Sequence, residues 1–195
     1  NAISIALNKN NFGDVLDIYN GQEDIKNKII KTPLNPDTTF SDDPLRMLRA
    51  IRFANQLNFK IEEETVKSIK LNRKRIEIIS QERITTELNK ILMCKRPSLG
   101  IKILDETGLL NIILPEITKL KGVDTINKIS HKDNFIHTLQ VLDNIGVMAD
   151  TKHKNLLWLK WSALLHDIAK PKTKKFVKKI GWTFHGHDII GSRMV

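Results

Sequence analysis

The 195-residue chain has few of the residues that crosslink a small protein or anchor it in a membrane. Its one cysteine, Cys94, allows no disulfide within the chain, and a reduced, cytoplasmic compartment is the simplest expectation. Cys94 lies in an apolar stretch, which favours a core residue over a nucleophile. No apolar run is long enough to span a bilayer, and no basic segment precedes an apolar one at the N-terminus. We therefore expect neither a membrane span nor a signal peptide.

Aromatic residues are also scarce, at 6%, whereas Ile, Leu and Lys are abundant, which favours helices. The net charge of +10 indicates a polyanionic partner, most simply nucleic acid. A generally Lys-rich proteome would give the same charge without such a partner. Basic residues gather at 170–179 and, in a smaller group, at 73–75. These groups either contact a phosphate backbone or form a solvated surface.

Residues up to about 36 show strand and turn signals. Residues 15–19 are β-prone and end in an Asn-Gly turn dipeptide, and residues 28–31 predict a second short strand. Because two strands alone make a marginal sheet, we expect their partners upstream of Asn1.

Helical patterning takes over from residue 37. Residues 122–130 are polar and loop-like, and Gly181 is expected at the turn of a small hairpin. Trp158 and Trp161 are three apart in a predicted helix and are expected in the core rather than as stacking platforms. Helices are predicted at residues 41–56 with Ser41 as N-cap, 62–71, 76–79, 97–107, 134–148 and 154–168, one follows Ser80, and a last one begins near His187.

Three charged residues recur at one spacing in the helix expected at residues 41–56. Asp43, Arg46 and Arg49 are three residues apart, so on a helix neighbours would lie about 60° apart on one face. A carboxylate acceptor would then stand beside two guanidinium donors. An ordinary surface ion pair has the same spacing and stabilises little, so the spacing alone leaves both interpretations open.

A carboxylate beside a guanidinium can read the edge of a base. Cytosine and adenine both present an amino donor next to a ring-nitrogen acceptor, which such a pair complements. Guanine and uracil present a carbonyl and a ring N–H there, and each mismatched buried group would cost about 1–3 kcal/mol. One such pair can therefore accept C and A and reject G and U, while a second arginine remains free for phosphate contact.

Several segments resemble, in order, the motifs of class II CCA-adding tRNA nucleotidyltransferases and bacterial poly(A) polymerases. The opening Asn-Ala-Ile resembles the tail of an Arg-Arg-Asp-Phe-Thr-x-Asn-Ala motif, and residues 16–25 resemble the motif after it. Residues 40–54, which include Asp-Asp-Pro-Leu-Arg, resemble the Glu-Asp-x-x-Arg nucleotide-recognition motif, with Asp42 where the family usually has Glu. Residues 80–88 resemble the helix motif that follows.

The resemblance implies roles for these residues. Asp43 and Arg46 would pair with the base of incoming CTP or ATP, and Arg49 would contact the nucleotide or its phosphates. Arg52 would brace the helix or approach the nucleotide. The family's catalytic Asp-x-Asp pair, which holds two Mg²⁺ ions, has no counterpart in this chain and is expected upstream of Asn1. We therefore expect a fragment of a longer protein that cannot transfer nucleotides alone.

Histidines and aspartates near the C-terminus resemble an HD domain, in residues 135–139, 164–170 and 184–188. The metal ligands implied by this resemblance are His137, His166 and Asp167. The residues expected at the rim of the site are Lys170, His187 and Asp188. Imidazole and carboxylate ligands suit divalent ions such as Mn, Fe, Ni or Mg, which would activate a water for phosphoester hydrolysis. The distant fourth ligand of that family, an Asp, is not identifiable here.

The expected fold is mainly α. It has a short β remnant of a nucleotidyltransferase head at 1–36, a helical neck and body at 37–121, and the truncated HD domain at 122–195. The leading hypothesis is part of an enzyme that adds C and A to tRNA 3′ ends from CTP and ATP, this segment selecting the base and binding tRNA. An HD-type phosphohydrolase and a non-catalytic RNA-binding module are the alternatives. CCA addition, A-only addition and poly(A) synthesis share these motifs, and the motifs set neither the HD metal nor the oligomeric state.

Overall fold

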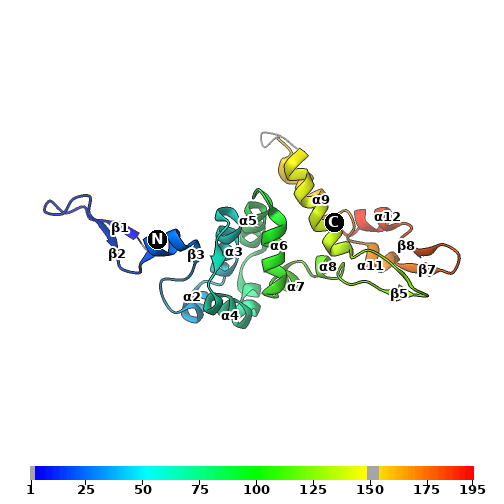
Figure 1. Cartoon of the computed structure of the whole chain (residues 1–195), viewed down its shortest axis with the longest axis horizontal. Helices are drawn as coiled ribbons and strands as arrows, with labels where there is room; N and C mark the ends of the chain where they lie inside the picture. Colours follow the sequence, from blue (N-terminus) through cyan, green and yellow to red (C-terminus); the bar gives the residue numbers. More distant parts are fainter. Residues whose placement is uncertain (1–2, 149–153) are drawn as a thin grey trace.

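The structure is a computed structural model that describes residues 3–148 and 154–195. The molecule is elongated, and its elements follow the long axis roughly in chain order (Figure 1). A β-hairpin lies at one end, a group of helices occupies the middle, and further helices with the C-terminus lie at the other end. The fold is mainly α, as the composition predicted. The first two residues of the opening Asn-Ala-Ile motif fall outside the described residues.

The strands near the N-terminus find partners within the chain. Strand β1 (Ile3–Ile5) pairs antiparallel with β2 (Val15–Asp17), and helix α1 (Gly21–Asn27) follows. Strand β3 (Ile29–Ile30) pairs in parallel with β4 (Lys60–Ile61). Each of the two predicted strands thus has one partner within the chain, and the further partners expected upstream of Asn1 stay a prediction. No strand was predicted at β4, which lies in a stretch interpreted as a break between helices.

The middle of the molecule is a helical body. On α3, Met47, Ile51 and Ala54 are buried on one face, as their spacing predicted. These side chains enter a core shared with the helices around α3. The elements of the body are α2 (Pro36–Asp42), α3 (Leu45–Leu57), α4 (Glu63–Asn72), the 3-10 helix η1 (Arg73–Ile78), α5 (Gln81–Leu92), α6 (Pro97–Glu106), α7 (Leu110–Ile113) and α8 (Pro115–Thr118).

The single helix predicted at residues 41–56 is two helices. Ser41 belongs to α2, and α3 begins at Leu45. The break has a local cause, because Pro44 disfavours the helical conformation of the residue before it. Asp43 is accordingly extended, at φ −141° and ψ 95°. Its Oδ1 accepts a hydrogen bond from the Leu45 N–H at 3.2 Å, so Asp43 caps the start of α3.

Over residues 122–148 and 154–195, the C-terminal part has four helices and two hairpins. The expected hairpin is present as β7 (Lys175–Val177) and β8 (Gly181–Thr183), and Gly181, at φ +93°, is the first residue of β8, directly after the turn. The hairpin of β5 (Thr125–Ile126) and β6 (Ile129–Ser130) lies in a stretch predicted as loop. The helices are α9 (Asn134–Met148), α10 (Leu156–Leu165), α11 (Lys170–Thr173) and α12 (His187–Ser192). Among residues 3–148 and 154–195, no helix is both long and apolar enough to cross a membrane.

One hydrophobic core crosses residue 121, where a domain boundary is predicted. Buried apolar side chains run continuously from Phe40 on α2 to Leu164 on α10. Lys160 on α10 reinforces this packing, because its buried Nζ donates to the carbonyl of Leu92 at 2.8 Å and to that of Cys94 at 3.1 Å. Burial lowers the pKa of Lys160 and raises the pKa of the Cys94 thiol, which fits a core residue rather than a nucleophile.

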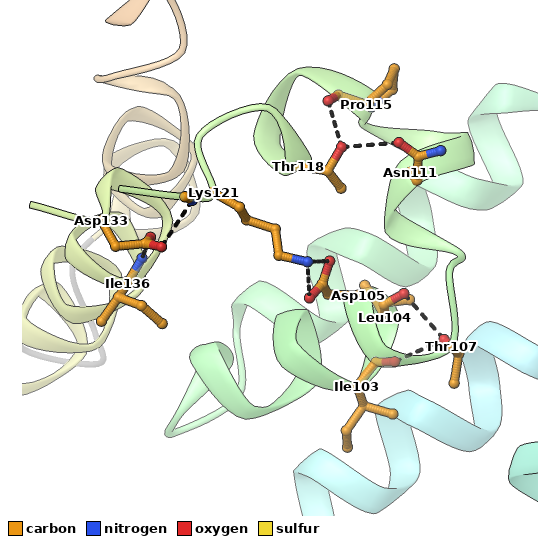
Figure 2. Close-up of polar contacts among 11 residues, drawn as sticks. Ile103, Leu104, Asp105, Thr107, Asn111, Pro115, Thr118, Lys121, Asp133 and Ile136 are labelled. Carbon is orange, nitrogen blue, oxygen red and sulfur yellow. Dashed lines mark hydrogen bonds and ion pairs between the residues drawn. The ribbon is translucent and has the colours of Figure 1, made fainter. Parts of the chain in front are cut away.

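Polar contacts fix the segment that leads from α8 to α9 (Figure 2). Lys121 Nζ contacts both carboxylate oxygens of Asp105 at 2.8 Å. Asp133 accepts from the Gly122 N–H at 3.0 Å and from the Ile136 N–H at 2.9 Å, so it caps α9. The C-terminal helices are thereby held against the body, and the division at 121 stays a prediction.

Candidate functional site

The Asp/Arg motif forms a charged cluster where α2 meets α3. Asp43 Oδ2 lies 3.9 Å from Arg46 Nε, and both side chains are partly exposed. Because Asp43 is the capping residue rather than part of the helix, its carboxylate is held by the backbone of α3 while facing the first arginine. The pairing of Asp43 with Arg46 expected from the spacing is thus present, although the continuous helix expected to carry it is not.

A second guanidinium reaches the same carboxylate from another helix. Arg83, in the first turn of α5, places Nη2 3.6 Å from Asp43 Oδ1. The carboxylate therefore stands between Arg46 and Arg83. Arg83 lies within residues 80–88, which resemble a family motif, but the resemblance gave it no part in the site. The two residues are far apart in the chain, and their spacing carries no signal.

Arg46 and Arg49 line a hollow of about 460 Å³ beside α3. Its other walls include Phe53 on α3 and the chain that follows β3, at Thr32 and Pro33. Two guanidinium groups that open to solvent beside an aromatic ring provide charged donors for phosphate and an apolar face for a base. The three residues singled out from the sequence thus lie together, with Asp43 beside the hollow through its contact with Arg46.

Arg52 braces the helix, which was one of the two roles left open. Its Nε lies 3.0 Å from Glu87 Oε2 on α5, and both side chains are largely buried. The guanidinium also lies over the ring of Phe53, with Cζ 4.1 Å from the ring centroid. Lys90 Nζ contacts the second oxygen of Glu87 at 2.9 Å. This network ties α3 to α5 behind the cluster and so fixes the relative position of Arg46 and Arg83.

The C-terminal histidines converge on Asp167, which is 1% exposed. Single ligand atoms of His137, His166 and Asp167 all lie within 4.8 Å of one another. His166 Nε2 is 3.2 Å from Asp167 Oδ2, and His137 Nε2 is 4.0 Å from the same oxygen. Asp167 and His166 follow α10 and His137 lies on α9, so the packing of these two helices builds the cluster.

The residues expected at the rim differ in their placement. Lys170 Nζ lies 2.7 Å from Asp167 Oδ2, and His187 Nε2 lies 3.8 Å from Oδ1. His187 is oriented by a 2.8 Å hydrogen bond between its Nδ1 and the Phe184 carbonyl. Asp188 is exposed and lines a separate hollow beside His166. The structure thus brings Lys170 and His187 to the cluster but gives Asp188 no contact with Asp167.

The contacts within the cluster favour the charged forms of Asp167 and His166. Burial alone would raise the pKa of Asp167, but hydrogen bonds and positive charge from His166 and Lys170 lower it to about 2. The hydrogen bond to Asp167 raises the pKa of His166. His166 Nδ1 lies 2.8 Å from the Ala163 carbonyl, which leaves Nε2 for the carboxylate or a metal.

The chemistry of these donors suits a divalent ion. Two imidazole nitrogens and one carboxylate oxygen are ligands that Mn, Fe, Ni and Zn accept. A cation at Asp167 Oδ2 would have to displace the ammonium of Lys170, which is then free to contact an anion. The described residues supply three ligand atoms within 4.8 Å, and no fourth ligand is assigned.

Family models match two separate segments of the chain. Residues 58–121 match a family described as the probable RNA and SrmB-binding site of polymerase A, and residues 134–195 match the HD domain. The multifunctional CCA protein of Neisseria gonorrhoeae is 35% identical over 182 residues, which is 92% of this chain and 42% of that protein. The A-adding tRNA nucleotidyltransferase of Deinococcus radiodurans is 31% identical over 92% of this chain and 42% of its own length.

A solved structure shows the same similarity to CCA-adding enzymes. The Bacillus stearothermophilus CCA-adding enzyme in complex with CTP superimposes with a TM-score of 0.54 at 31% identity, over 60% of this chain and 29% of that one. The chain spans 42% of the two curated relatives described above. The chain thus contains a segment that matches the probable RNA-binding site of polymerase A, followed by an HD domain, and over most of its length it is similar to part of CCA-adding and A-adding tRNA nucleotidyltransferases.

Proposed function

We propose that this chain selects the incoming nucleotide and binds tRNA in an enzyme that adds C and A to tRNA 3′ ends from CTP and ATP. The observation that carries the proposal is the Asp43 carboxylate between Arg46 and Arg83, beside a hollow lined by Arg46 and Arg49. The carboxylate accepts from the amino group that C and A share, and a guanidinium donates to their ring nitrogen.

Further observations support this proposal. The relatives are named for CCA or A addition, and one related enzyme was solved with CTP. The net charge of +10 favours a polyanionic partner such as tRNA. A cytoplasmic location fits a chain whose one cysteine is free and buried. The Mg²⁺ ions of nucleotide transfer belong, in this proposal, to carboxylates outside this chain.

Nucleotide binding by the chain tests the proposal. Equilibrium titration with CTP, ATP, GTP and UTP should give tighter binding of CTP and ATP. Arg46→Ala should remove that preference, because one of the two hydrogen-bonding groups is lost. Arg193→Ala, which removes an exposed guanidinium at the end of α12, should leave that preference unchanged. Equal affinity of the unaltered chain for all four nucleotides would sink the proposal.

The proposal also restricts what the isolated chain can do. Incubated with tRNA, CTP, ATP and Mg²⁺, it should give no extension, since the chain contains no Asp-x-Asp pair. Clear extension would mean that the bond-forming centre lies within these 195 residues.

A second function, metal-dependent phosphoester hydrolysis, is favoured by the His137, His166 and Asp167 cluster. A bound divalent ion would supply the Lewis acid for that reaction. In the proposal Lys170 leaves Asp167 and holds the substrate phosphate, while the His166 Nδ1 contact with the Ala163 carbonyl keeps Nε2 directed at the site.

Hydrolysis of bis-p-nitrophenyl phosphate with added Mn²⁺ tests this second function. His166→Ala should abolish both hydrolysis and calorimetric Mn²⁺ binding. His185→Ala should leave both unchanged, because His185 is exposed and no contact joins it to Asp167. Hydrolysis that survives His166→Ala would contradict the assignment.

A further inference from the structure

A lysine-rich stretch without a carboxylate forms α11 and the hairpin of β7 and β8. Residues 170–183 contain six lysines and no aspartate or glutamate. Two of the six are paired, Lys170 with Asp167 and Lys174 with Asp124. The other four are exposed, and none of them pairs with a carboxylate within residues 3–148 and 154–195. These four are Lys172, Lys175, Lys178 and Lys179.

The lysines of the hairpin stand on a surface that tertiary contacts hold in shape. Trp182 on β8 packs against Phe176 on β7, with ring centroids 5.4 Å apart. Its Nε1 donates to the Ile129 carbonyl at 3.0 Å, which ties this hairpin to that of β5 and β6. Since side chains alternate along a strand, Lys175 and Val177 lie on the face of β7 opposite Phe176, and both are exposed. Such a fixed array loses less conformational freedom on binding than a loose loop.

The hairpin of β5 and β6 adds cations at the same end of the molecule. Its two turn residues, Asn127 and Lys128, have φ of 51° and 63°, as in a tight two-residue hairpin turn. Lys128 and Lys132 are exposed, whereas Asp124 beside them is already paired. Both hairpins lie at the end of the molecule away from β1 and β2 (Figure 1). Together they present ammonium groups that the chain leaves unneutralised, which fits a polyanion.

We propose that this lysine surface, made by α11 and the two hairpins, binds the phosphate backbone of a folded RNA. The inference rests on tRNA being a partner of the chain, as in the proposed function. The Asp43 cluster, where α2 meets α3, lies in the middle of the molecule, and the hairpins lie at its end (Figure 1). An RNA whose 3′ end is held at that cluster therefore contacts the lysine surface with phosphates remote from this end.

The lysine surface does not read the RNA sequence. An ammonium group binds phosphate as a point charge, and phosphate contacts position a nucleic acid without identifying its bases. The gain comes from counterions that the RNA releases when its phosphates are neutralised. The surface thus adds affinity for the body of the RNA, whereas Asp43 and Arg46 discriminate between incoming nucleotides.

Binding of labelled tRNA to the 195-residue chain over a series of salt concentrations tests the inference. The combined variant Lys175→Gln, Lys178→Gln and Lys179→Gln should weaken binding at least about tenfold at about 0.1 M salt, because three phosphate contacts are lost. The slope of log K against log salt should become shallower by about two to three. The affinity for CTP should stay the same, since the Asp43 cluster is untouched.

A matched control removes the same charge at the other end of the chain. It combines Lys9→Gln, Lys26→Gln and Lys28→Gln, which alter exposed lysines between β1 and β2 and at α1. Its loss of tRNA affinity should be clearly smaller. Equal losses for the two combined variants would show that net charge alone decides binding, and the inference would be overturned.

A measurement on the unaltered protein does not depend on how the variants fold. Bound tRNA should slow the acetylation of Lys175, Lys178 and Lys179 by an amine-reactive reagent, followed by mass spectrometry. If tRNA binds and the three lysines react as fast as before, the inference is overturned while tRNA binding stands.

An anionic membrane is another surface that lysines attract, and Ile180 at the turn of the hairpin is 73% exposed. RNA is favoured because residues 58–121 match an RNA-binding family. Binding to phosphatidylserine vesicles that the combined hairpin variant abolishes, with tRNA binding unchanged, would assign the surface to a membrane and overturn the inference. If the chain binds no tRNA at all, the inference and the RNA-binding part of the proposed function fall together, while the preference for CTP and ATP is tested separately.

Discussion

Asp143 on α9 ties the C-terminal helices to the body, and Asp143→Ala should destabilise the chain. The Ser98 N–H donates to its Oδ1 at 3.1 Å, and the Ser98 hydroxyl donates to its Oδ2 at 2.6 Å. Ser98 is the second residue of α6, so the carboxylate caps a helix start whose N–H groups lack helical partners. Hydrogen bonds to a charged group each contribute about 1.5–3 kcal/mol. Because Ser98 is buried, both of its donors would lose their partner.

We expect Asp143→Ala to lower the free energy of unfolding by about 3 kcal/mol. Ser98→Ala should cost about half as much, since the backbone N–H keeps its acceptor. Asp105→Ala is the matched control, because its partner Lys121 is half-exposed and such pairs contribute about 0.2–1 kcal/mol (Figure 2).

Urea unfolding followed by far-UV circular dichroism and by tryptophan fluorescence measures these changes. The three tryptophans all lie beyond residue 157, so fluorescence reports the C-terminal helices and circular dichroism reports the whole chain. With one shared core, the two transitions should coincide in the unaltered protein. A loss for Asp143→Ala no larger than for Asp105→Ala would refute the argument.

Three other predictions follow from single contacts. Gly100→Ala should destabilise the chain by about 1–2 kcal/mol in urea melts, because the added Cβ would lie 2.5 Å from a neighbouring side chain. At Gly146 the nearest atom to an added Cβ is 3.4 Å away, so Gly146→Ala should be neutral or stabilising. The pKa of Asp167 is lowered from 3.8 to about 2 in the folded chain, so its ionisation adds about 2 kcal/mol to the free energy of unfolding. This contribution is present above pH 4 and is lost as the pH falls towards 2. Asp167→Asn should remove that part of the pH dependence of unfolding. Arg83→Gln should weaken CTP binding severalfold while leaving GTP binding unchanged, since it removes a guanidinium that orients the Asp43 carboxylate; equal losses for both would contradict that role.

The apolar periodicity predicted most helices of the body and both helices α9 and α10, because a helix that buries one face carries apolar residues at a spacing of three or four. It could not predict the break at Asp43, where the local effect of Pro44 outweighs the pattern. Strand β4 was missed for another reason. Its two residues are strand only because β3 lies beside them, which is a tertiary effect.

The site was predicted as far as its residues are close in sequence or match a motif. Asp43 with Arg46, and His166 with Asp167, are near neighbours in the chain, and the structure shows both contacts. Arg83 reaches Asp43 only through the packing of α5 on α3, which no spacing encodes. Trp158 was expected in the core, but it is 68% exposed. The prediction was wrong because it rested on the apolar character of the side chain alone.

The proposed selection of C and A depends on the Asp43 carboxylate, which accepts a hydrogen bond from the amino group at the base edge. CTP and UTP carry the same sugar and triphosphate and differ at that edge, so the ratio of their dissociation constants isolates the effect. Asp43→Asn keeps the oxygen that caps α3 but adds a donor. The unaltered chain should bind CTP at least about tenfold more tightly than UTP, and Asp43→Asn should bring the ratio close to one. A preference for CTP that survives Asp43→Asn at full strength would contradict the central claim.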